Sequence, residues 1–358
     1  MSRIAVKMDT DTIPVTGVEE LEKHLDELLA DPTLPPTHKL FDHVELQLTD
    51  ANIPPLIPKL LPKITEILKQ YQQDPAILCS LAIKLLSPLN FTQILSLASE
   101  EALIQALRSP APSANILAMT VLEKAARSPS DAAILAMMNN VITNFLTQWL
   151  SAPQVEVGEK GSKVLGDLLD VDCDTRPPDG VSLSGMEIAV RKPPGQGLVW
   201  RRIFHDRDIY DLILSLCRGN TLSPQQQSLA QGRLLRVLPR LAALNFRAVT
   251  WTDFTDLNQR YANFSGNGGL LHFAALSMID KEDMLVHLNL IDFFEALLSI
   301  QRITPFSTYK MDILTKLVKD ATAQDNVLKA AILTLPERTV PEEAEDLSRF
   351  IQEILNSQ

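Results

Sequence analysis

Residues 111–126 read "APSANILAMTVLEKAA", and this pattern recurs along the 358-residue chain. A Pro stands where a first helical turn would begin, where its missing N–H costs least, and an apolar face follows. The same pattern is found in "DPAILCSLAIKLL" from Asp74, "APQVEVGEKGSKVLGDLL" from Ala152 and "SPQQQSLAQGRLLRVLPRL" from Ser223. We therefore predict a helix at each of these four segments.

The first three of these prolines, Pro75, Pro112 and Pro153, are about forty residues apart. We expect partner helices between and after the repeated segments, over Asp131–Leu150, Phe204–Cys217, Met284–Ile300 and Pro341–Leu355. A helix pair repeated at this period is typical of HEAT and armadillo solenoids, in which stacked pairs bury each other's apolar faces. An irregular helical bundle is the alternative fold.

The composition also favours an all-α protein, because apolar residues make up 46% of the chain and aromatic residues only 5%. We expect one curved α-solenoid over residues 1–358. Its parts are an acidic segment (1–50), N-terminal repeats (51–171), a long insert loop (172–197) and C-terminal repeats (198–358). The insert contains two Pro-Pro steps and four Gly, so it cannot be helical throughout. Its stretch "MEIAV" is a candidate strand, and "NFSGNGG" (263–269) is a second helix break.

The net charge of −11 disfavours a nucleic-acid partner, since binding to phosphates requires an excess of Lys and Arg. Three separated Cys without CxxC spacing indicate a reducing compartment. The first 30 residues lack the apolar core of a secretory signal. The uncharged run Ala132–Val155 contains Asn139, Asn140, Asn144 and Gln148 in mid-span, and such amides are costly in lipid. We expect a cytoplasmic and nuclear protein that does not enter membranes and is a monomer when free.

Motifs for catalysis and cofactor binding are missing from the sequence. The six His lack metal-site spacing, and neither a P-loop nor a GxSxG motif occurs. The glycine-rich stretches 195–197 and 265–269 do not follow strands, and we interpret them as turns that end helices. We therefore expect a binding protein that is not an enzyme, with no catalytic residue, no metal and no cofactor.

Two groups of side chains are candidates for binding a partner. Asn140, Asn144 and Gln148 recur every four residues, so they form an uncharged amide stripe on one helical face. Such a stripe suits hydrogen bonds to a partner, although a solvated face without charges is the alternative.

The second group lies in the stretch "WRRIFHDRDIYD" (200–211), which includes Trp200, Arg201, Arg202, His205, Asp208 and Asp211. Asp206 is placed to cap a helix, Asp208 lies in its first turn, and Arg207 can pair with Asp211 four residues later. Trp and Arg before this cap are common interface anchors. The alternative is that Trp200 and Phe204 hold the insert on the core while the Arg residues pair with acids.

The segment "GQGLVWRRIFHDRDIYDLILSLC" (195–217) resembles the HEAT-repeat chaperones of 26S proteasome assembly related to non-ATPase regulatory subunit 5, in their fungal branch. This resemblance implies a C-shaped solenoid that binds the C-terminal domain of one AAA+ ATPase subunit of the regulatory-particle base. Such a chaperone prevents premature docking on the core particle and leaves before maturation. A fungal member of the family also carries a mismatch-repair name.

Two other functions stay open from the sequence. An importin- or armadillo-type transport or scaffold protein would use Trp-x-x-x-Asn on its inner helices, but none of the three Trp has Asn four residues later. A DNA-repair-associated factor is the second alternative, and the acidic charge gives it no support through direct DNA contact.

Overall fold

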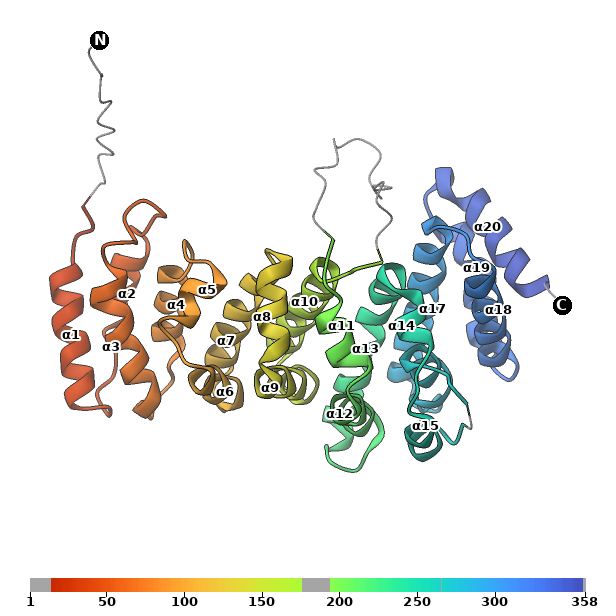
Figure 1. The fold of residues 1–358 in the computed structure, drawn as a ribbon, viewed down its shortest axis with the longest axis horizontal. Helices are drawn as coiled ribbons and strands as arrows, with labels where there is room; N and C mark the ends of the chain where they lie inside the picture. Colours follow the sequence, from red (N-terminus) through yellow and green to blue (C-terminus); the bar gives the residue numbers. More distant parts are fainter. Residues whose placement is uncertain (1–13, 176–193, 265, 357–358) are drawn as a thin grey trace, which may run out of the picture. The chain divides into compact units, whose positions relative to one another are not determined.

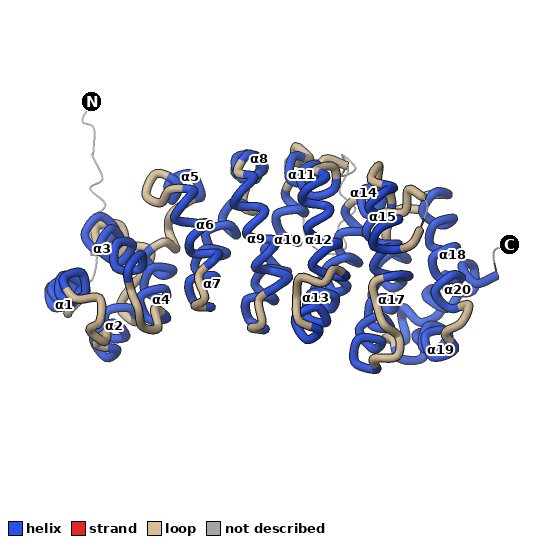
Figure 2. Tube along the Cα trace, turned by 90° about the horizontal axis from the view of Figure 1, so that it is seen from below, coloured by secondary structure: helices blue, strands red, loops and turns tan. Residues whose placement is uncertain are grey.

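In the computed structural model, residues 14–175, 194–264 and 266–356 are described. Within these ranges the chain is helical apart from loops and one isolated bridge between Trp251 and Gly268 (Figure 2). The predicted all-α fold is therefore confirmed. The candidate strand "MEIAV" and most of the predicted insert, residues 176–193, lie outside the described residues.

Contacts divide the chain into two compact units, with the division between Val121 and Leu122 inside one helix. The helices of the first unit are α1 (Val18–Ala30), α2 (His38–Glu45), α3 (Ile57–Gln70), α4 (Ala76–Leu85), α5 (Phe91–Leu95), α6 (Glu100–Arg108) and the first part of α7 (Pro112–Ala125).

The second unit contains the end of α7 and all later helices (Figure 1). These are α8 (Pro129–Met137), α9 (Asn139–Ser151), α10 (Val155–Val171), α11 (Leu198–Phe204), α12 (Arg207–Arg218), α13 (Pro224–Leu244), α14 (Phe246–Thr250), α15 (Thr255–Ala262), α16 (Leu270–His272), α17 (Met284–Ile303), α18 (Thr308–Thr322), α19 (Asn326–Thr334) and α20 (Pro341–Asn356). A π-helical turn, η1 (Phe273–Ser277), follows α16, and a 3-10 turn, η2 (Leu335–Arg338), follows α19.

The four segments that open with Pro are helices, namely α4, α7, α10 and α13. The predicted helices from Met284 and from Pro341 are also confirmed, as α17 and α20. The loop after α15 confirms the second helix break, although Ser265 lies outside the described residues. The structure thus contains a helix at each segment where a Pro near the predicted first turn is followed by a long apolar face.

The prediction of one helix over Asp131–Leu150 was wrong, because α8 ends and α9 begins around Met138. Met138 has a non-helical backbone with ψ of 69°. Two consecutive Asn residues follow it, and Asn is a weak helix former in helix interiors. The cap of α8 is Ser128, whose hydroxyl accepts from the Asp131 N–H, and not Ser130 or Asp131 as predicted.

The second unit is built from two rows of packed helices. In one row α10 packs along α13 and α13 packs along α17, while in the other α9 packs along α12 (Figure 1). The helices α10 and α13 contact each other although the predicted insert lies between them in the sequence. Among the described helices, α17 alone is long and apolar enough to cross a membrane, and here its buried face packs on α13.

Buried polar side chains satisfy the carbonyl groups at several helix ends, which otherwise lack intrahelical partners. In the first unit the Asn115 amide donates to Ala106 O and Leu107 O, each at 3.0 Å, at the end of α6. In the second unit Arg233 serves the end of α9, and Lys310 serves the end of α17. These contacts join neighbouring helices by hydrogen bonds as well as by apolar packing.

Candidate protein-binding surface

The helix α11 is positioned by a neck at the base of the predicted insert. Asp172, which is fully buried, accepts hydrogen bonds from Val199 N at 2.6 Å and Trp200 N at 3.2 Å. Its carboxylate therefore caps the start of α11 from the other side of the insert. Gly195 N donates to Cys173 O at 3.0 Å, and Gly197 N donates to Asp172 O at 2.9 Å. These bonds close the two ends of the insert onto each other.

The glycines of the neck are needed for its geometry. Gly197 has a left-handed backbone with φ of 66°, which favours glycine. A Cβ on Gly195 would lie 2.0 Å from the Asp172 carbonyl carbon. The 195–197 stretch was predicted to end a helix, and that prediction was wrong because these residues directly precede α11, with Gly197 as its N-cap, and close the neck.

Trp200 was predicted to be an exposed anchor, and the structure contradicts this. Its side chain is 3% exposed, stacks on Phe204 with ring centroids 5.2 Å apart, and donates from Nε1 to Leu169 O at 2.8 Å. The reason is that Leu198–Phe204 is itself a helix, so Trp200 faces the core instead of preceding a cap. The alternative reading, in which Trp200 and Phe204 hold this segment on the core, fits the structure.

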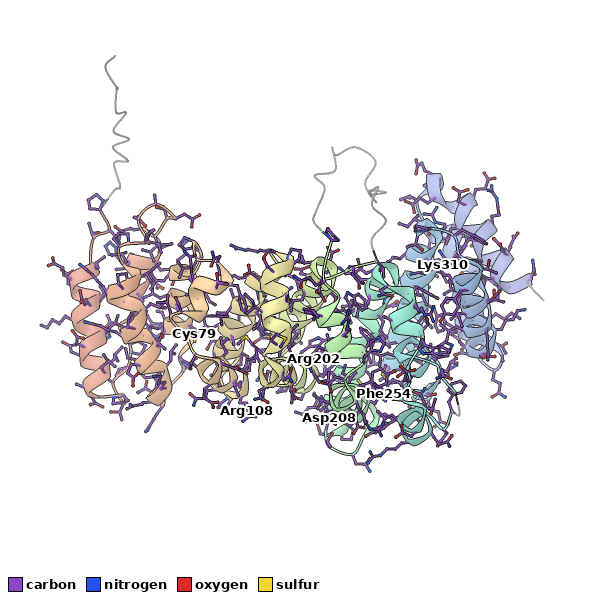
Figure 3. All side chains as sticks on the ribbon, in the orientation of Figure 1. Cys79, Arg108, Arg202, Asp208, Phe254 and Lys310 are labelled. Carbon is purple, nitrogen blue, oxygen red and sulfur yellow. The ribbon has the colours of Figure 1, made fainter. Side chains whose placement is uncertain are left out.

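The charged residues around α11 differ in how far contacts within the protein hold their side chains. Arg202 is half-buried and donates to Ala136 O at 3.3 Å and to Asp206 Oδ2 at 2.8 Å. It therefore holds α11 against α8, so part of its role lies in the fold (Figure 3). Arg201 and His205 are exposed. These two side chains remain available for a partner.

Asp206 caps α12 as predicted, since its carboxylate accepts from Asp208 N at 3.1 Å. Asp208 lies exposed in the first turn, also as predicted. The predicted pairing of Arg207 with Asp211 was wrong. Arg207 instead forms a two-bond ion pair with Asp256 of α15 and lies over the Phe254 ring, 5.8 Å from its centroid.

The Arg207 guanidinium lowers the pKa of the exposed Asp256 carboxyl through this direct hydrogen bond. Asp211 is half-buried and lies 3.9 Å from the Arg260 guanidinium, which is also on α15. The helix α15 therefore borders α12 through Asp256 and Arg260, together with Phe254, which directly precedes α15 and is labelled in Figure 3. Sequence reasoning missed these residues because they are about fifty positions away and carry no motif.

The amide stripe lies on α9. Asn140 is exposed, and Asn144 and Gln148 are half-buried. The Asn144 amide donates to Asn140 O at 2.6 Å, a contact within one helical turn. The opposite face of α9 is buried through residues such as Phe145. The stripe is therefore a surface feature of α9, as the sequence predicted, and its role in binding stays a prediction.

The two predicted groups lie on helices that pack against each other. The helix α9 contacts α12, and α8 contacts α11. The surface we consider for binding consists of the outward side chains of α9 together with those of α11 and α12. We call it the α9–α12 surface, and it comprises Asn140, Asn144, Gln148, Arg201, His205, Asp208 and Asp211. Its chemistry is mixed, with three amides, one exposed Arg, one exposed His and two carboxylates.

Burial governs the chemistry of the cysteines and of His272. Cys79, Cys173 and Cys217 are buried and free. Burial raises the pKa of the Cys79 thiol to about 11 and also raises the pKa of Cys217, so both are protonated at neutral pH. Burial lowers the pKa of His272. No group of three His, Cys, Asp or Glu in the described ranges could hold a metal ion.

One cavity of about 90 Å³ lies in the first unit, between α3, α4, α6 and α7. Its walls are almost entirely apolar, with Leu61, Ala82, Leu103 and Ala118 among them. Pockets for small molecules are usually about 300–1,000 Å³ and contain a few convergent polar groups. This cavity is therefore a gap in the helix packing and not a candidate ligand site.

One family model matches part of the chain. Residues 19–158 match the family model described as DNA mismatch repair protein HSM3, N terminal domain. The HSM3 match runs from α1 to the first turn of α10 and covers less than half of the chain. It includes the amide stripe of α9, whereas the α11–α12 part of the surface follows it. A search of curated proteins found no match to the chain.

Proposed function

We propose that this protein is a proteasome assembly chaperone that binds the C-terminal domain of an AAA+ ATPase subunit of the regulatory-particle base. The observation that carries the proposal is the HSM3 match over residues 19–158. It is independent of the resemblance to proteasome-assembly chaperones at residues 195–217, a family in which one fungal member carries a mismatch-repair name. Two separate parts of the chain thus support one family.

The α9–α12 surface suits a folded protein partner. Its amides can donate and accept hydrogen bonds without the desolvation cost of charged groups. Arg201 and His205 lie on and at the end of α11, a helix that Asp172 and Trp200 fix in place, so little ordering is needed on binding. Bound to this surface, an ATPase domain would be kept from docking on the core particle. We place this activity in the cytoplasm and nucleus.

Affinity purification of the tagged full chain tests the proposal. We expect base ATPases to copurify without mature core particle. Arg201→Glu should weaken the complex at least about tenfold while the melting temperature stays unchanged, because Arg201 is exposed. Arg349→Glu on α20 is the matched control, since Arg349 is also exposed and lies outside the α9–α12 surface. Recovery of nuclear import cargo alone would contradict the proposal and favour a transport protein.

A DNA-repair-associated factor is the second candidate, because the matched family is described as a mismatch repair protein. Direct DNA binding is disfavoured by the net charge of −11. Fluorescence anisotropy with duplex DNA at physiological salt decides this point. We expect no binding, whereas a salt-sensitive affinity would favour the repair role over the chaperone role.

A further inference from the structure

The first turns of α17 expose large apolar side chains that the α9–α12 surface does not include. Met284 is 76% exposed, Leu285 75% and Leu288 50%. Residues at positions i, i+1 and i+4 of a helix span about 100° of its circumference. These three side chains therefore form one continuous stripe, which we call the α17 patch. Contiguous exposed apolar side chains mark interaction sites more often than single ones do.

The α17 patch is held rigidly from behind. Val286 and Leu290, on the other side of the same turns, are buried. His287 Nε2 lies 2.9 Å from Asp325 Oδ2, which fixes the start of α17 against the start of α19. The patch therefore does not reach its exposed position by fraying of a helix end, and it is preorganised for a partner.

A glycine of the neighbouring helix α13 borders the patch. Gly232 lies inside α13, where Gly costs about 1 kcal/mol relative to Ala. A Cβ at Gly232 would meet only Asn289 of α17, at 3.5 Å, an ordinary contact distance. Packing within the protein thus does not require this glycine. Asn289 is one turn from Leu285, so Gly232 borders the patch on the α13 side and presents no side chain there.

The border of the patch is acidic. Asp280, Glu282 and Asp283 precede it and are all exposed. Lys281, the base among them, is bound to the nearly buried Asp325 at 3.0 Å. Arg236, one turn beyond Gly232 on α13, is paired with Glu159 at 3.3 Å. The charge that remains for a partner is therefore negative.

From the apolar stripe, the neighbouring glycine and the acidic border, we infer that the α17 patch binds an amphipathic helical segment of another protein whose apolar face is bordered by Lys or Arg. Met284 suits such a partner because its flexible thioether side chain adapts to different apolar shapes. The apolar face of the segment would lie on Leu285 and Leu288 beside Gly232, and its basic residues would face the carboxylates. This inference does not rest on the proposed chaperone function.

Fluorescence anisotropy with the full chain and two synthetic helical peptides tests the inference. One peptide has Leu on one face and Lys on the others, and the second replaces every Lys by Glu. We expect the Lys peptide to bind, with an affinity that falls as salt rises, and the Glu peptide not to bind. The double variant Leu285→Asp/Leu288→Asp should weaken binding of the Lys peptide at least about tenfold.

Two further variants separate binding from folding. Gly232→Lys should keep or raise the melting temperature, because Lys is a better helix former, and should weaken binding by bulk and charge. Leu46→Asp in the first unit is the matched control, since Leu46 is 87% exposed, and it should leave binding unchanged. Equal binding of the Lys peptide to all variants would overturn the inference. Self-association that the double variant abolishes, or binding only to phosphatidylglycerol vesicles, would also overturn it.

Discussion

The contact between Gly158 of α10 and Arg233 of α13 gives a prediction in which two effects oppose each other. Arg233 is 8% exposed and donates to Trp149 O at 2.9 Å, Leu150 O at 3.1 Å and Gln154 O at 2.9 Å. A Cβ on Gly158 would lie 2.0 Å from Arg233 Nε. Gly158→Ala must therefore displace the guanidinium, although Ala is the better helix former.

The sizes of these two opposing effects decide whether Gly158→Ala stabilises or destabilises the protein. Replacing an interior helical Gly by Ala stabilises a helix by about 1 kcal/mol. A hydrogen bond from a charged donor contributes about 1.5–3 kcal/mol, so losing two of the three costs about 3–6 kcal/mol. We expect Gly158→Ala to lower the free energy of unfolding by about 2–5 kcal/mol. Urea unfolding followed by far-UV circular dichroism measures this change.

Two comparisons make the test specific. Gly232→Ala, which meets no close neighbour, should raise the free energy of unfolding by about 1 kcal/mol. In an Arg233→Ala background the clash is gone, so Gly158→Ala should become neutral or stabilising. Stabilisation by Gly158→Ala in the wild type, equal to that of Gly232→Ala, would refute the reasoning.

Three further predictions concern the neck and the end of α17. Burial raises the pKa of the Asp172 carboxyl above its unfolded value of 3.8, so the folded protein takes up a proton there more readily than the unfolded chain does as pH falls. When urea titrations are moved from pH 7 towards pH 4, the free energy of unfolding of the wild type should therefore rise relative to that of Asp172→Asn. Replacing residues 176–193 by a short Gly-Ser linker should leave the melting temperature nearly unchanged in calorimetry, because the neck closes the insert, whereas Gly195→Ala should lower it. Lys310→Met removes the donor to Gln301 O, Thr304 O and Pro305 O and should lower the free energy of unfolding by about 2–4 kcal/mol in urea titration.

The helices that sequence predicted best are those with local signals. Pro112 and Pro224 open α7 and α13, and Asp206 caps α12, since each acts within its own first turn. The break at Met138 was missed because the apolar period continues across it. A strong apolar period shows which faces are buried but does not show where the backbone leaves the helix.

The candidate surface was harder to predict because long-range contacts decide which side chains are free. Trp200 and Arg202 were grouped with Arg201, yet the first is in the core and the second bonds to Ala136 of α8. Arg207 had a local partner in Asp211 and took Asp256 of α15 instead. Local spacing fixes which residues can pair, while the packing of distant helices selects among them.

Titration of the purified full chain with the isolated C-terminal domains of the regulatory-particle base ATPases tests the central claim most directly. Isothermal calorimetry should show one domain binding with one-to-one stoichiometry and at least micromolar affinity, about −8 kcal/mol or tighter. Arg201→Glu should weaken that binding, and Arg349→Glu should not. If none of these domains binds, the chaperone function proposed for this helical protein is contradicted.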